Sequence, residues 1–122
     1  MDETLAGGLI GGGAMLVSGL FIMWMGNLMA RRRFGRSKWA GIRTPSTMKS
    51  DEAWFAAHDV AAPTMSTAGT LGAAGGLVGI IAALLGAGNG VVVGLILGGA
   101  ALMSVLLVVA TVRGARAARE VE

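Results

Sequence analysis

The chain of 122 residues is 54% hydrophobic and 14% charged, and it contains no cysteine. So apolar a composition excludes a soluble domain of this size, and the missing cysteines exclude disulfides, thiol nucleophiles and thiolate metal sites. The net charge of +3 does not indicate nucleic-acid binding, because the basic residues gather beside apolar runs, where they mark membrane edges.

The first predicted element is a membrane-spanning helix over residues 5–30. This run carries no charged residue, and at about 1.5 Å per residue it can cross a hydrocarbon core of about 30 Å. The positive charges follow the run instead of preceding it, so we expect a retained span and not a cleaved signal peptide. Its glycine-rich first half favours close approach to a neighbouring helix, and its bulkier second half is expected to meet lipid or fill a wider gap.

The basic residues predict the orientation. All 10 Lys and Arg residues lie within 31–49 or 113–119, and loops rich in Lys and Arg stay on the cytoplasmic side. We therefore expect an N-out, C-in protein and read the cluster that starts at Arg31 as a topology signal. The bilayer it meets is expected to contain anionic lipids.

A cytoplasmic loop and a short interfacial helix are predicted over residues 31–62. Within it, residues 37–49 are expected to form an ordered loop and not a helix, because Pro45 disfavours helix at the residue before it. Ser50 is of a cap-forming type and is followed by two acidic residues, so it is the predicted N-cap of the helix. Pro63 is expected to interrupt or restart that helix after about Ala62.

Several side chains of this segment have predicted roles. We expect Trp54 and Phe55 to sit at the headgroup boundary or to cover the preceding loop. Arg43 offers a planar fork of donors and is expected to pair with a carboxylate, for which Glu52 and Asp51 are the nearest candidates, with a lipid phosphate or with backbone carbonyls. A structural hydrogen bond between His58 and the loop is favoured over a proton or metal role, since a single His without Cys is a poor metal site.

Two further spans, residues 64–85 and 91–112, complete the predicted single membrane domain of residues 1–122. An external turn over 86–90 joins them, and 113–122 is the predicted cytoplasmic tail. Glycines spaced four apart place small residues on single helix faces, which we expect to be helix contacts within the chain or with another copy. The predicted packing glycines are Gly72, Gly76, Gly90, Gly94 and Gly98.

The central segment resembles the signature of the SdpI family of small bacterial membrane proteins. The motif reads W-x-G-I-R-T-P-x-T-x-x-S-x-E-x-W-x-x-x-H, and its positions are Trp39, Gly41, Ile42, Arg43, Thr44, Pro45, Thr47, Ser50, Glu52, Trp54 and His58. Family members usually carry Asn where Ser37 stands and Gly where Ala62 stands. The namesake of the family confers immunity to a secreted toxin peptide.

The resemblance implies a multi-pass protein of the bacterial inner membrane that acts by binding, with no cofactor and no metal. Its partner would be an apolar toxin peptide in the helix bundle or a cytoplasmic regulator at the segment 31–58. No set of nucleophile, base and orienting group can be assembled from the sequence, so an enzyme is not expected.

An alternative from another class is a small accessory or structural subunit of a larger membrane complex, or a homo-oligomer. Three glycine-faced spans bury little by themselves and leave ample surface for a membrane protein partner. A transporter or channel ranks third, because no charged residue marks an ion path inside the spans.

Overall fold

A computed structural model of the chain describes residues 2–32 and 42–121. In these residues the chain forms four helices, α1 (Glu3–Ala30), α2 (Pro45–Met48), α3 (Asp51–Leu84) and α4 (Asn89–Arg119). Three of them, α1, α3 and α4, are long and apolar enough to cross a membrane. The predicted all-α membrane protein with three spans is confirmed.

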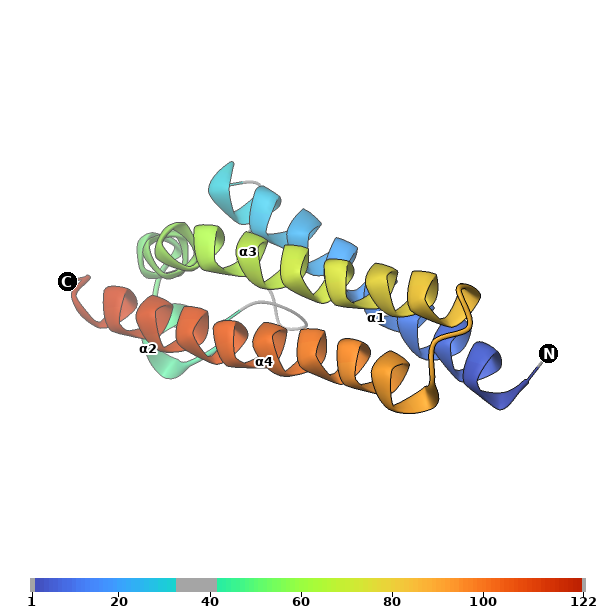
Figure 1. Cartoon of the computed structure of the whole chain (residues 1–122). Coiled ribbons are helices and arrows are strands. Elements are labelled where there is room, and N and C mark those ends of the chain that lie inside the picture. The colour runs from blue at the N-terminus through green and yellow to red at the C-terminus, as the bar shows by residue number, and fades with distance from the viewer. Residues whose placement is uncertain (1, 33–41, 122) are drawn as a thin grey trace.

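Helix α3 is the centre of the bundle. Both α1 and α4 pack along it, whereas they have few contacts with each other. Figure 1 shows α3 and α4 side by side, with α1 crossing behind α3. The N-terminus and the turn from α3 to α4 lie at one end, and α2 and the C-terminus lie at the other, so Lys49 and the basic residues at the end of α4 lie at the same end. The orientation of this bundle in a membrane stays a prediction.

Small residues bring the backbones of α1 and α3 into contact. A Cβ atom built on Gly76 would lie 2.5 Å from the carbonyl oxygen of Gly12, and one built on Gly19 would overlap the backbone nitrogen of Ala73. Gly72 faces α4 instead, against the sulfur of Met103. Close backbone approach of this kind maximises van der Waals contact where lipid removes the hydrophobic drive for helices to associate.

The other predicted packing glycines do not pack within the described chain. A Cβ atom on Gly90, Gly94 or Gly98 would meet no atom within 4 Å. These residues therefore face outward from α4, and contact with another copy or a partner stays a prediction for them.

One predicted boundary is wrong. The helix that begins after Ser50 does not end near Ala62, because α3 runs without a break from Asp51 to Leu84 with Pro63 inside it. Its first turns are seen nearly end-on in Figure 1 while the rest lies across the picture. Proline lacks an N–H group and its ring crowds the carbonyl four residues earlier, so it bends a helix that tertiary packing holds together on both sides.

Most of the predicted tail, residues 113–122, is helical. Residues 113–119 continue α4 as helix, and Ala115 and Ala118 in it are buried. The sequence there is rich in Ala and Arg, which are strong helix formers, and the basic side chains of Arg116 and Arg119 suit the negative end of the helix dipole. At the other end of α4, a short turn joins it to α3. Gly86 in this turn adopts the left-handed conformation, with φ 81°.

Candidate functional site: a clip between a loop and helix α3

The segment before α3 contains a one-turn helix where the sequence predicted only loop. Thr44 is extended, with φ −118° and ψ 165°, and Pro45 takes the first position of α2. Proline does exclude helix from the residue before it, as predicted, but its fixed φ also suits the first helical position. The prediction of a non-helical loop is therefore wrong for residues 45–48.

Thr44 and Thr47 bond to each other reciprocally. The backbone N–H of Thr44 donates to Thr47 Oγ1 across 2.8 Å, and the backbone N–H of Thr47 donates to Thr44 Oγ1 across 3.2 Å. The Thr47 hydroxyl also donates to the carbonyl oxygen of Ile42 at 2.7 Å. Thr47 is fully buried, so its hydroxyl ties the start of the segment to α2 away from solvent.

His58 fastens the same segment to α3. Its Nε2 accepts the backbone N–H of Ile42 at 3.0 Å, and its Nδ1 lies 2.7 Å from the carbonyl oxygen of Trp54. These partners assign the neutral ring with the proton on Nδ1. The predicted structural hydrogen bond between His58 and the loop is confirmed.

Trp54 is not at the surface. Its exposed fraction is 0%, and its ring stacks on His58 with centroids 4.1 Å apart. Of the two places predicted for Trp54, the headgroup boundary is wrong, because the buried stripe of α3 takes in Trp54 and His58 together with Ala53, Ala57 and Ala61. Phe55 is only partly buried and lies beneath the guanidinium of Arg32, 5.7 Å from it.

Ile42 links this arrangement to α4. Its side chain is 6% exposed and packs with Ala61 and Ala110. A Cβ atom on Gly114 would come within 2.7 Å of Ile42 Cδ1 and 2.9 Å of the carbonyl oxygen of Ala57, so only glycine fits at that point of α4. We call Ile42, Thr44, Thr47, Trp54 and His58 the loop–helix clip.

Charged side chains surround the clip without entering it. Arg32 binds Asp59 through Nη2 at 2.6 Å and Nε at 3.1 Å, and this hydrogen bond raises the pKa of Arg32. The Lys49 ammonium donates to the carbonyl oxygen of Val121, and Ser50 caps α3 as predicted by accepting the N–H of Ala53.

Arg43 and Glu52, both predicted site residues, are exposed, and no ion pair joins them in the described residues. Trp39 and Gly41, the first two positions of the motif, lie outside the described residues. No group of three or more His, Asp or Glu side chains in ranges 2–32 and 42–121 is arranged to hold a metal ion.

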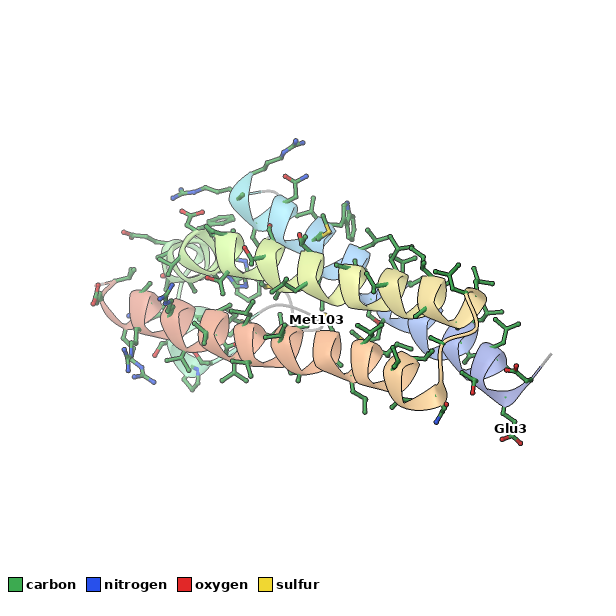
Figure 2. All side chains as sticks on the ribbon, in the orientation of Figure 1. Glu3 and Met103 are labelled. Carbon is green, nitrogen blue, oxygen red and sulfur yellow. The ribbon has the colours of Figure 1, made fainter. Side chains whose placement is uncertain are left out.

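An apolar pocket adjoins the clip. It has a volume of about 310 Å³ and is bounded by side chains of α1, α3 and α4 together with Ile42. Figure 2 shows Met103 between α3 and α4, and this residue is not part of the pocket wall. The residues that line the pocket are Phe21, Ile22, Met25, Met29, Ile42, Met65, Leu107 and Thr111.

Three features of the site were missed from the sequence. Asp59 gave no signal, because its partner Arg32 is distant in the chain. Gly114 lacks a glycine four residues away and so falls outside the spacing used to find packing faces. The methionines of the pocket come from separate spans, although Met25 and Met29 are one helical turn apart and share a face of α1.

A family model described as the SdpI/YfhL protein family matches residues 33–112. The match takes in the clip, all of α3 and most of α4. No curated protein and no solved structure gave a significant match to the chain.

Proposed function

The chain belongs to the SdpI/YfhL protein family, and we propose that it is an immunity protein of the bacterial inner membrane that binds an apolar toxin peptide in its helix bundle. The three spans and the family membership support a multi-pass membrane protein of the immunity type. In this proposal the protein acts by binding and carries out no chemical step.

The pocket beside the clip is the observation that carries the proposal. It is lined by aliphatic, aromatic and thioether side chains from all three spans, and its volume of about 310 Å³ is at the lower end of ligand sites. Three of those residues are the methionines Met25, Met29 and Met65. Methionine side chains are unbranched and polarisable, so they adapt to apolar groups of different shape.

The clip accounts for the motif residues in this proposal. Four of them, Ile42, Thr47, Trp54 and His58, are buried and held together by hydrogen bonds and ring stacking, so these four do not form a surface for recognition. Their effect is to hold Ile42, through its N–H and its carbonyl oxygen, in the wall of the pocket. The buried motif residues other than Ile42 thus position a pocket residue instead of contacting the peptide themselves.

A second candidate is recognition of a cytoplasmic regulator. The exposed charges of Arg43 and Glu52 at the rim of the clip favour it, since neither is paired with the other in the described residues. Charged rims steer and orient partners more than they add affinity. The pocket has no role in this candidate, which separates the two experimentally.

Survival of expressing cells tests the proposal. Bacteria carrying the protein are exposed to a panel of secreted apolar peptides, together with the variants Thr111→Trp and Val112→Trp. Thr111 lines the pocket, and Val112 is its neighbour at the same depth, exposed to 45% and outside the pocket wall. We expect protection by the wild-type protein and by Val112→Trp, and its loss in Thr111→Trp.

If Thr111→Trp protects cells as well as wild type does, the result favours the second candidate, recognition at the exposed rim. Arg43→Ala should then abolish protection. If no peptide of the panel is resisted, and purification in mild detergent yields a stoichiometric larger membrane protein, the accessory-subunit alternative replaces the immunity proposal.

A further inference from the structure

A second groove lies between α3 and α4 and shares no residue with the apolar pocket. Its volume is about 260 Å³, and it is lined by Pro63, Thr64, Thr67, Leu106, Val109 and Arg113. Pro63 marks the point where α3 bends, and the first turns of α3 leave the direction of the rest of the helix there (Figure 1). The groove therefore sits at the bend.

The polar groups of the groove suit an anion. Arg113 is exposed and forms no ion pair with a carboxylate of the described residues, so within that part of the chain no negative charge matches its guanidinium donors. Thr64 is partly buried and lines the groove beside it. A guanidinium and a hydroxyl can both donate to phosphate oxygens, and bonds from a charged donor are the stronger kind.

The apolar side of the groove suits a hydrocarbon chain. Leu106, Val109 and Arg113 occupy positions i, i+3 and i+7 of α4, which lie on one face of a helix. Leu106 and Val109 are partly buried along the groove, and Arg113 is the first charged residue after the uncharged run 89–112. Along this face of α4, the aliphatic side chains come first and the cation follows where the apolar run ends. The acyl chain and the charged headgroup of a phospholipid follow one another in the same order.

We propose that the groove at the bend of α3 binds an anionic phospholipid, with its phosphate at Arg113 and Thr64 and its acyl chain along Leu106 and Val109. Thr67 donates its own hydroxyl to the carbonyl oxygen of Pro63 at 3.0 Å. The lipid belongs to the same leaflet as the Arg31 cluster. This site is independent of the proposed peptide pocket.

Binding of phosphatidylglycerol to the full chain in a neutral detergent tests the proposal, measured by native mass spectrometry with phosphatidylcholine and inorganic phosphate as comparison probes. The variant is Arg113→Gln, and the matched control is Arg116→Gln, which removes the same charge from an exposed residue of α4 outside the groove. We expect wild type and Arg116→Gln to retain phosphatidylglycerol equally and Arg113→Gln to bind it about tenfold more weakly.

Equal losses in Arg113→Gln and Arg116→Gln would overturn the proposal, because they would show only a general attraction of basic residues to anionic lipid. Equal retention of phosphatidylcholine would also overturn it. Competition by inorganic phosphate in the range of the lipid concentration would reveal a free-phosphate site in place of a lipid site. Should Arg113→Gln fail to fold, Thr64→Val leaves all charges in place, and unchanged lipid binding in that variant counts against the phosphate position.

Discussion

The backbone N–H of Ile42 donates a hydrogen bond to Nε2 of His58 at 3.0 Å, and both residues are withdrawn from the surface, at 6% and 1% exposed. The other ring nitrogen of His58 faces the carbonyl oxygen of Trp54. One neutral imidazole therefore satisfies a donor of the loop and an acceptor of α3 at once. Because the N–H of Ile42 and the Nδ1–H of the ring would each cost free energy if buried without a partner, these two hydrogen bonds fasten the loop to α3.

Removing the acceptor of His58 should weaken the fold. His58→Phe keeps a ring against Trp54 but leaves the N–H of Ile42 buried without a partner, so we expect a loss of about 1–3 kcal/mol in the free energy of unfolding. His58→Gln, which retains a carbonyl acceptor, should lose less. Unfolding by denaturing detergent from mild micelles measures both, and a Phe variant as stable as wild type would show that the hydrogen bond contributes nothing.

Thr47 should need its hydroxyl and not its methyl group. Thr47→Val preserves shape but removes the donor to the carbonyl oxygen of Ile42 and the acceptor for the N–H of Thr44. We expect Thr47→Val to destabilise the protein by about 1–3 kcal/mol and Thr47→Ser to stay close to wild type. The same unfolding assay decides this, and equal stability of the Val and Ser variants would argue against the bonding described here.

The two tryptophans of the described chain should respond differently to truncation. Trp54 has no exposed surface, so Trp54→Ala is expected to cost about 3–5 kcal/mol through the cavity it leaves. Trp24 is 54% exposed on α1, and Trp24→Ala should cost less than about 1 kcal/mol. Comparable losses in the two variants would restore the interpretation of Trp54 as an interfacial anchor.

The effect of a glycine-to-alanine substitution on stability should depend on what the glycine contacts and not on its spacing in the sequence. Gly114→Ala places a Cβ atom against Ile42 and the Ala57 carbonyl, so we expect about 1–3 kcal/mol of destabilisation by overpacking. Gly94→Ala meets nothing within 4 Å and should gain up to about 1 kcal/mol from helix propensity. The free energy of unfolding and the molecular size of each variant are measured together. If Gly94→Ala destabilises the protein and also abolishes a dimer, the face of α4 that carries Gly94 pairs two copies of the chain.

The sequence predicted what depends on local patterns. The spans follow from uncharged runs of sufficient length, and the cap at Ser50 follows from a residue type at a helix start. The hydrogen bond between His58 and the loop was predicted because a single histidine, with no cysteine or second histidine, is a poor metal site. The spans and the cap need only neighbours in the chain.

What the sequence did not predict depends on how the helices are rotated and bent. Trp54 is of a type common at the membrane interface, yet the packing of α3 on its neighbours buries it. Gly94 has the spacing of a helix contact, yet no atom lies within 4 Å of the place of a Cβ atom there. Pro63 shows the same limit, because propensity alone favours a break and the contacts on both sides hold the helix together. Arg32 meets Asp59 only because the bend in α3 and the end of α1 come together in space.

Photo-crosslinking of the bound peptide tests the central claim most directly. A photoreactive phenylalanine analogue replaces Met65 in the pocket wall or, as the control, Val105, which is 60% exposed on α4 and outside that wall. With the peptide against which the cells gain protection, we predict a crosslinked product from position 65 and none from position 105. Crosslinking from position 105 alone, or equally from both, would contradict capture of the peptide in the pocket.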